Sequence, residues 1–255
     1  MNRKGIRDWR SELLKAADLK EILTELIFPR RCPVCDGVVP FRKGLIHPQC
    51  VKAFSVIGDM RCMKCGRPLK HTEEELCVYC RGRTHNFDLG IALYRYDDAM
   101  SASIFRYKYG NRREYAEFFS REMTRLLLPD LRRLSPQALT AIPISRRKHR
   151  KRGYNQAALL SSGIGALTGI PVYNDLLIRV RDTLPQKTLD SAGRIKNLKK
   201  AFKIARNDVK LNSIMVIDDI YTTGSTVDEA AAVLKAYGIG RVYVMTLSAV
   251  MQRDV

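Results

Sequence analysis

Two adjacent carboxylates followed by a hydroxyl- and glycine-rich turn form the pattern in this sequence that points most directly to chemistry. Asp218 and Asp219 come after the apolar run 214–217 and precede the turn Thr222-Thr223-Gly224-Ser225-Thr226. Carboxylates accept hydrogen bonds from hydroxyl groups. The turn leads into a helix, and backbone N–H groups at a helix N-terminus stabilise an anion. The pattern therefore predicts a ligand that carries both a diol and a phosphate.

The elements around this pattern are a strand, a turn and a helix. The apolar run 214–217 predicts a buried parallel strand, and helical spacing over 225–237 predicts a helix that ends at Gly238. The acid pair would then lie at the end of the strand, where open α/β sheets bind ligands. The alternative is an ordinary strand–turn–helix with capping hydroxyls, but a cap requires neither the adjacent acids nor Gly224.

This segment resembles the signature of type I phosphoribosyltransferases, in which an apolar strand is followed by Asp-Asp-x-x-x-Thr-Gly-x-Thr. In that family the acid pair contacts the ribose 2- and 3-hydroxyls of phosphoribosyl pyrophosphate (PRPP), and the turn binds its 5-phosphate. The resemblance implies that Asp218 and Asp219 are the catalytic pair. It also implies a PRPP site made of Asp218, Asp219, Thr222, Thr223, Gly224, Ser225 and Thr226.

All seven cysteines lie between positions 32 and 80, in a repeat that is typical of zinc ligands. With one histidine they form two units with identical gaps: Cys32, Cys35, His47 and Cys50, then Cys62, Cys65, Cys77 and Cys80. Four soft ligands suit tetrahedral Zn2+ and leave no open position, so up to two structural zinc ions are expected. Crossed pairing and a single-zinc module are the alternatives. His71 and His85 break the repeat and are not expected to be ligands.

The chain is strongly basic, with 45 Lys and Arg against 26 Asp and Glu and a formal charge of +19. Such an excess favours polyanionic partners, although a basic proteome or a solubility effect would also produce it. The densest run, 146–152, predicts nucleic-acid contacts through Arg147, Lys148, Arg150, Lys151, Arg152 and the adjacent aromatic Tyr154. The alternatives are a solvated loop or a pyrophosphate grip for the run, and simple packing for Tyr154.

Strands and helices alternate through the second part of the chain. Strands are predicted at 91–96, 139–144, 176–180, 214–217 and 241–248, and helices at 98–109, 112–128, 154–168, 191–200 and 225–237. This alternation predicts an α/β fold with a mostly parallel sheet and helices on both faces. The expected domains are an amphipathic N-terminal helix (1–29), a zinc-binding module (30–82) and a type I phosphoribosyltransferase-like domain (83–255).

Further motifs follow one another in an order that is similar to the ComF family (ComFC-like). They are Leu26-Ile-Phe-Pro29-Arg-Arg-Cys32, Phe105-Arg-Tyr-Lys108-Tyr-Gly110, Ile142-Pro143 to Gln156-Ala157, Thr183-x-x-Gln186, Arg194 to Phe202, and the acid-pair signature. The resemblance covers residues 26 to 248; His47 departs from it, since many members carry cysteine there. It implies a zinc-binding module joined to a type I phosphoribosyltransferase domain, and a role in DNA uptake during natural transformation.

Two functions follow from this resemblance. The first is a ComF-type protein that binds PRPP with Mg2+ and also single-stranded DNA, with a competence helicase as a partner from family context. The alternative is an active PRPP-dependent phosphoribosyltransferase of nucleotide metabolism with no role on DNA. The pyrophosphate and its Mg2+ would meet Ser145 and Arg146, and the loop 182–194 would act as a lid. The acceptor, and whether transfer occurs at all, stay open at this point.

The sequence also bears on location. No apolar stretch approaches the length of a membrane-spanning helix, and the N-terminus shows no secretion signal. The odd number of cysteines argues against disulfides. We therefore expect a cytoplasmic protein without membrane insertion.

Overall fold

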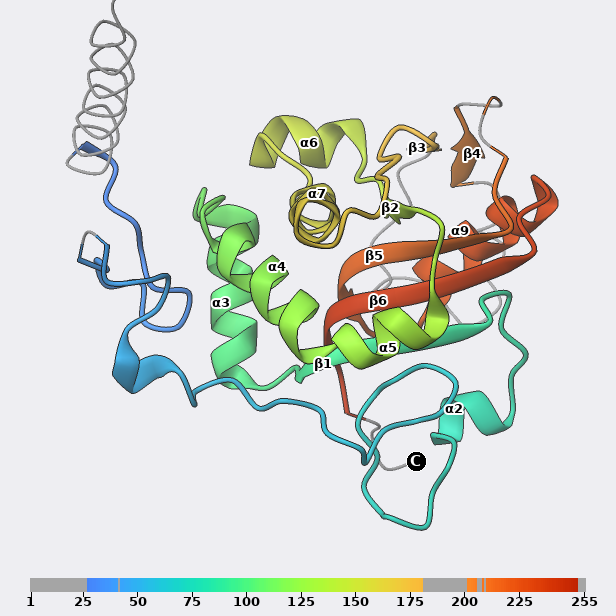
Figure 1. The fold of residues 1–255 in the computed structure, drawn as a ribbon, viewed down its shortest axis with the longest axis horizontal. Coiled ribbons are helices and arrows are strands. Elements are labelled where there is room, and N and C mark those ends of the chain that lie inside the picture. Colours follow the sequence, from blue (N-terminus) through green and yellow to red (C-terminus); the bar gives the residue numbers. More distant parts are fainter. Residues whose placement is uncertain (1–26, 41, 181–200, 206–207, 209, 252–255) are drawn as a thin grey trace, which may run out of the picture.

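The computed structural model describes residues 27–40, 42–180, 201–205, 208 and 210–251. At its centre is a parallel four-stranded sheet in the order β1-β6-β5-β2 (Figure 1). The strands of this sheet are β1 (Leu89–Arg95), β2 (Leu139–Ala141), β5 (Ser213–Tyr221) and β6 (Arg241–Ala249). A separate antiparallel pair is formed by β3 (Leu177–Arg179) and β4 (Phe202–Ile204). The predicted α/β fold with a mostly parallel sheet is confirmed.

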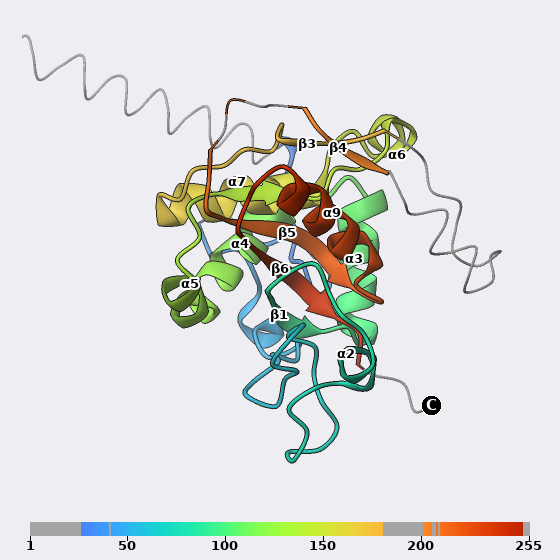
Figure 2. The ribbon, with the colours of Figure 1, turned by 90° about the vertical axis from the view of Figure 1, so that its right-hand side faces the viewer.

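Helices cover both faces of the sheet, as Figures 1 and 2 show together. Side chains alternate between the faces along a strand. Ile214 and Val216 of β5 pack with α9 (Ser225–Ala236), whereas Met215 and Ile217 belong to the core on the opposite face. That second core includes α3 (Asp98–Tyr109), α4 (Tyr115–Leu126), α5 (Leu128–Leu134) and α7 (Gln156–Thr168). The other helices within the described residues are α6 (Arg146–Arg152), α2 (Val78–Arg81) and the 3-10 turn η1 (Pro48–Cys50).

Most element boundaries agree with the periodicity of the sequence. The helix predicted over 98–109 is confirmed as α3, and the side chain of Asp97 caps it by accepting a hydrogen bond from the backbone N–H of Met100 (2.9 Å). The helix predicted over 112–128 is shorter in the structure, where α4 ends at Leu126 and α5 begins at Leu128, with Pro129 in the first turn of α5, where the missing N–H of proline is tolerated. The elements predicted over 182–200, and most of the N-terminal helix predicted within 1–29, lie outside the described residues.

The predicted zinc-binding segment contains two tight turns with the same backbone hydrogen bond, one over residues 32–37 and one over residues 62–67; we call each of them a knuckle. In the first, the N–H of Cys32 donates to the carbonyl of Gly37 (2.9 Å); in the second, the N–H of Cys62 donates to the carbonyl of Arg67 (2.8 Å). The repeat found in the ligand spacing is therefore also a repeat of backbone structure. Nothing in the ranges that the structure describes is a helix with the length and apolarity needed to cross a bilayer.

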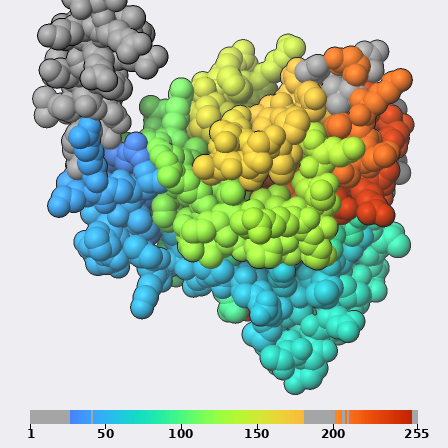
Figure 3. Space-filling view, viewed as in Figure 1, coloured from blue at the N-terminus to red at the C-terminus, as the bar shows by residue number. Residues whose placement is uncertain are grey.

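The chain between the two knuckles runs along the outer edge of β1. The N–H of Ile57 donates to the carbonyl of Leu93 (2.8 Å), and the N–H of Arg95 donates to the carbonyl of Ser55 (2.8 Å). These bonds satisfy backbone groups that an edge strand would otherwise expose. In the space-filling view the predicted zinc-binding segment, coloured blue to teal, lies along the left side and the bottom of the molecule (Figure 3). The zinc module is thus packed onto the sheet.

Candidate functional site

Asp218 and Asp219 lie inside β5, which corrects the expectation that they follow its end. The strand continues to Tyr221 because β6 pairs with it as far as Ala249. On its other side the pairing is shorter, since β2 ends opposite Ile217. The acid pair therefore lies just beyond the carboxyl end of β2, at the edge of the sheet where open α/β folds bind ligands.

The two carboxylates have different environments. The Nζ atom of Lys108 on α3 lies 2.8 Å from Oδ1 of Asp219, and both side chains are largely buried. Asp218 accepts a hydrogen bond from the backbone N–H of Asp219 (2.8 Å). Burial, and then repulsion from Asp219, raise the pKa of Asp218 to about 7. A carboxyl group perturbed in this way is typical of a functional site.

Positive side chains gather around the acid pair. The pKa of Lys148 on α6 is lowered because its ammonium group is desolvated and is repelled by Arg179, Arg152 and Lys108. The charge of Arg179 on β3 also acts on Asp218, whose pKa it lowers in opposition to the burial. Cations that repel one another in the free protein are stabilised when an anion binds among them. The electrostatics of this edge therefore favour an anionic ligand.

The turn after β5 depends on glycine. Gly224 is the N-cap of α9 and has a φ of +77°, in the left-handed region that strains any other residue. A Cβ atom there would also collide with the ring of Tyr221. The hydroxyls of Thr223 and Ser225 lie 3.0 Å apart on either side of it. The turn thus brings two hydroxyls to the N-terminus of α9, a site suited to phosphate.

A cavity of ≈ 600 Å³ lies between the loop after β2, α6 and β3. It is lined by Ser145 and Arg146, the residues expected to meet pyrophosphate, and by Asn155 and Arg179. Arg179 also acts electrostatically on Asp218, so the cavity lies within the electrostatic range of the acid pair. The apolar part of its wall comes from two segments and consists of Pro143, Ile144, Leu177, Ile178 and Val180. Its size is within the range of small-molecule sites.

The basic run 146–152 forms α6, a helix that was not predicted from the sequence. Ser145 caps it by accepting a hydrogen bond from the backbone N–H of Lys148 (3.3 Å), and Gly153 ends it with a φ of +76°. None of the seven residues of α6 is buried. The predicted nucleic-acid contacts Arg147, Lys148, Arg150, Lys151 and Arg152 are therefore presented together on one short helix.

Tyr154 does not belong to this exposed surface, so its predicted base contact is wrong. Its side chain is only 6% exposed, and its hydroxyl donates to the carbonyl of Tyr107. The exposed aromatic side chains beside α6 are instead Phe105 (64%) and Tyr109 (50%) on α3, with ring centres 5.1 Å apart. The guanidinium group of Arg152 lies 4.8 Å from the Tyr109 ring. Their spacing of four residues in a predicted helix is the signal that could have identified them.

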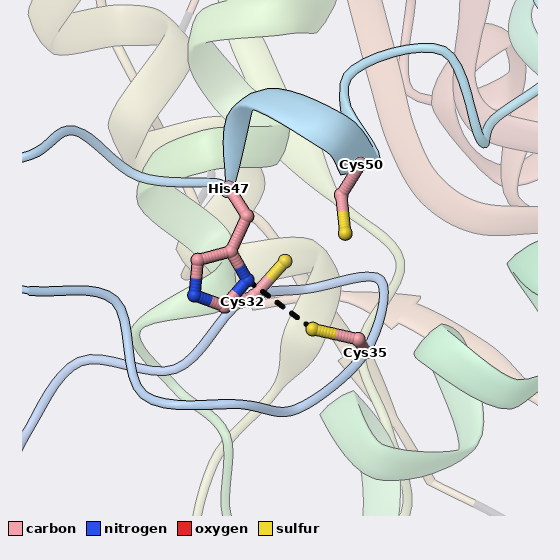
Figure 4. A group of neighbouring side chains, drawn as sticks. All are labelled: Cys32, Cys35, His47 and Cys50. Atoms are coloured by element: carbon pink, nitrogen blue, oxygen red, sulfur yellow. Dashed lines mark hydrogen bonds between the residues drawn. The ribbon is translucent and has the colours of Figure 1, made fainter.

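The first predicted zinc site is assembled as the repeat implies. The ligand atoms of Cys32, Cys35, His47 and Cys50 lie within 4.8 Å of one another (Figure 4). The Nδ1 atom of His47 faces Cys35 Sγ at 3.3 Å, while its Nε2 atom lies 2.9 Å from the carbonyl of Val38. A zinc-bound imidazole has this arrangement, with one nitrogen toward the metal and the other donating to a carbonyl. The donors fit a Cys3His zinc site with Nδ1 as the ligand atom.

The second site is formed by Cys62, Cys65, Cys77 and Cys80, all of them buried. The sulfur atoms of Cys65 and Cys77 lie 3.8 Å apart. Two thiolates on a tetrahedral zinc, with Zn–S bonds of about 2.3 Å, would be separated by nearly this distance. Hydrogen bonds from the other three cysteines hold the pKa of Cys62 well below its usual range, which favours the thiolate that zinc requires. Both donor sets fit structural zinc.

Comparisons with known proteins extend this assignment. Residues 23–81 match the family model of the double zinc ribbon domain. Competence protein F of Haemophilus influenzae is 29% identical over 233 residues, which cover 87% of this chain and 97% of that protein. DNA utilization protein YhgH of Salmonella typhimurium is 29% identical over 225 residues, covering 87% and 98%. Competence protein ComFC of Streptococcus pneumoniae is 27% identical over 199 residues, covering 74% and 80%.

The similarity to competence protein F extends beyond the zinc ribbons. It does not depend on the cysteines alone, because the double zinc ribbon covers residues 23–81 and the similarity to competence protein F covers 87% of the chain. The chain is therefore a relative of competence protein F and ComFC, and its resemblance to the ComF family is confirmed.

Proposed function

We propose that this protein binds PRPP, or a closely related phosphorylated sugar, at the edge of the sheet formed by β5 and the following turn. The observation that carries the proposal is the pair Asp218–Asp219, followed by a glycine-dependent turn and surrounded by cations from α3, α6 and β3. The carboxylates would accept hydrogen bonds from the ribose hydroxyls. The hydroxyls and N–H groups of residues 222–226 would bind the 5-phosphate.

The pyrophosphate end of the ligand would lie toward the cavity, at Ser145 and Arg146. Mg2+ bound with the pyrophosphate would neutralise its charge and make it a better leaving group. In a transfer reaction the bond from ribose C1 to pyrophosphate breaks, an acceptor nucleophile bonds to C1, and positive charge develops on the sugar. The carboxyl groups of Asp218 and Asp219 would stabilise that charge electrostatically.

Calorimetry with PRPP and Mg2+ tests this site. The double variant Asp218→Asn/Asp219→Asn should lose PRPP binding, because an amide cannot carry the negative charge of a carboxylate and its NH2 group donates where the ribose hydroxyls need an acceptor. Asp59→Asn is a matched control, since Asp59 is an exposed carboxylate in the zinc-binding segment. Equal PRPP affinity of the wild-type chain and the double variant would refute the site.

A role in DNA uptake is the wider context that we propose. The relatives are named for competence and DNA utilization, and the exposed basic helix α6 suits the phosphate backbone of single-stranded DNA. Phe105 and Tyr109 would stack on bases beside it. A cytoplasmic location and a competence helicase as partner belong to this proposal.

The salt dependence of single-stranded DNA affinity tests the role of α6. Replacing Arg150, Lys151 and Arg152 with Ala should weaken binding and reduce the slope of log K against log salt by about 2, because about 0.7 counterions are released per phosphate contact. The control replaces Arg121, Arg125 and Arg133, which are exposed on α4 and α5, and causes the same change in net charge. A flat salt response, or equal losses in both triple variants, would contradict the proposal.

The cavity favours a second candidate, an active phosphoribosyltransferase of nucleotide metabolism with an unknown acceptor and no DNA role. It combines an apolar wall with the side chains of Ser145, Arg146 and Arg179, as an acceptor site would. Incubation with PRPP, Mg2+ and a panel of nucleobases, with and without single-stranded DNA, distinguishes the candidates. Pyrophosphate release that depends on a nucleobase and not on DNA would favour the enzyme of nucleotide metabolism.

A further inference from the structure

The second zinc ribbon reaches the phosphate turn through one buried arginine. Arg67, two residues after Cys65, is only 2% exposed, and its Nη2 atom donates a hydrogen bond to the carbonyl oxygen of Thr222. Its guanidinium carbon lies 4.7 Å from the ring centre of Tyr79 and 5.3 Å from that of Tyr221. A side chain of the zinc module therefore directly binds the first residue of the turn.

A second connection joins the same ribbon to the first turn of α9. Cys80 Sγ lies 3.4 Å from Nε2 of His85, and Nδ1 of His85 lies 3.3 Å from Oδ1 of Asp228. Asp228 also accepts hydrogen bonds from the backbone N–H (2.6 Å) and the side-chain amide (3.2 Å) of Asn86. The helix that begins at the phosphate turn is thus fixed to the chain leaving the second zinc site.

Zinc binding alone does not account for Arg67. The first knuckle has Gly37 at the equivalent place, and its carbonyl accepts the same hydrogen bond from the first cysteine of the knuckle. The second knuckle is also seated differently: a Cβ atom on Gly66 would lie 2.6 Å from the Cα atom of Ile91 in β1. The contact of Gly66 with β1 and the contact of Arg67 with the turn thus both belong to the second zinc ribbon.

We propose that Arg67 is a positioning residue for the phosphate turn and that it couples the second zinc site to ligand binding. By holding the Thr222 carbonyl toward the zinc ribbon, it leaves the N–H groups of the following residues to face the anion. Loss of the second zinc frees Arg67 and loosens the turn, whereas the first zinc has no such effect. This inference rests on the proposed sugar-phosphate site.

The coupling has a reciprocal consequence. If the second zinc stabilises the turn in its binding form, the ligand must stabilise zinc at the second site by the same factor. At equilibrium with a competing chelator, PRPP with Mg2+ should therefore increase the retention of one zinc ion. Loss of the other zinc ion, held by the first site, should not change.

The experiment compares Arg67→Gln with Arg61→Gln. Arg61 belongs to the same ribbon but pairs with Asp130 on α5 and does not touch the turn. Arg67→Gln should keep both zinc ions and bind PRPP about tenfold more weakly, within the usual range of coupling between sites. Arg61→Gln should lower thermal stability and leave PRPP affinity within about twofold, while Arg67→Lys should restore part of the affinity because it can still donate to the carbonyl.

The outcomes separate this inference from the proposed function. If the wild-type chain does not bind PRPP, the proposed site is refuted, and the coupling is refuted with it. Wild-type binding that Arg67→Gln fully retains would overturn the positioning role alone. If Arg67→Gln does not fold, equilibrium competition between the wild-type chain and a chelator for zinc decides. Tighter retention of one zinc ion in the presence of PRPP supports the coupling, and equal retention with and without PRPP overturns it.

Discussion

Lys108 and Asp219 form an ion pair of 2.8 Å between α3 and β5, although 111 residues separate them in the chain. Beside this ion pair, burial and the charge of Asp219 raise the pKa of Asp218 to about 7. The two acids therefore have different environments: Asp219 contacts a cation, and Asp218 is close to half-protonated at neutral pH. A ligand that hydrogen-bonds to both must therefore act on two different carboxyl groups.

This ion pair should contribute measurably to stability. Lys108→Met leaves the largely buried Asp219 without its cation and should lower the free energy of unfolding by about 2 kcal/mol. Asp219→Asn in the same chain should recover part of this loss, giving a coupling energy of about 1 kcal/mol in a double-mutant cycle. Urea unfolding at pH 7.5 provides the measurement.

The pair Glu122–Arg125 on α4 serves as the control for this cycle. Its Arg125 side chain is 64% exposed, so its coupling energy should be below about 0.5 kcal/mol. A Lys108–Asp219 coupling no larger than that of the control would show that the pair is incidental.

Asp218 should make the stability of the protein depend on pH in a definite direction. Its pKa is raised from 3.8 to about 7, so the folded state binds more protons than the unfolded state between these values. The contribution to stability is therefore present at low pH and is lost as the pH rises from about 4 to 7. Asparagine does not titrate, so Asp218→Asn does not lose stability in this way. The melting temperature of Asp218→Asn minus that of the wild-type chain should therefore increase from pH 5 to pH 8. A difference that stays constant over this range would contradict the raised pKa.

His47 should be replaceable as a zinc ligand by cysteine but not by alanine. The wild-type chain and His47→Cys should each carry close to two zinc ions, because both keep four donors at the first site. His47→Ala should fall toward one. Elemental analysis of protein purified without chelators measures the zinc content, and two ions retained in His47→Ala would show that His47 is not a ligand.

The aromatic pair on α3 should contribute to single-stranded DNA binding. Base stacking is worth about 1–3 kcal/mol per base, so Phe105→Ala and Tyr109→Ala should each weaken binding about fivefold or more. Met63→Ala, at an apolar side chain that is 66% exposed on the second ribbon, is the control. Fluorescence anisotropy with a labelled oligonucleotide provides the affinities. Losses that do not exceed that of Met63→Ala would remove the pair from the DNA-binding surface.

Much of the fold could be predicted because it depends on patterns among residues that are close in the sequence. Apolar runs such as 214–217 mark buried strands, and the identical gaps between cysteines group the two zinc sites correctly. The helix α6 could not be found in this way. Its seven residues are all basic, so the run has no apolar period, although Lys and Arg are good helix formers.

The candidate site was only partly predictable for a different reason. The acid pair and the turn are contiguous in sequence, but the residues that hold them in place, such as Arg67 and Lys108, are far from them in the chain. The contact from Arg67 to Thr222 spans 155 residues and depends on how the second ribbon packs against β1. The burial of Tyr154, which lies between α6 and α7, likewise depends on its contact with Tyr107 in α3. Such relationships arise from tertiary packing, which a single sequence does not display.

A structure of the protein with PRPP and Mg2+ would test the central claim most directly. The account predicts ribose hydroxyl oxygens within about 2.6–3.0 Å of the carboxylates of Asp218 and Asp219. It also predicts the 5-phosphate on the turn 222–226, with the pyrophosphate directed toward Ser145 and Arg146. Electron density for the sugar phosphate at another place, or a turn left empty at saturating PRPP, would contradict it.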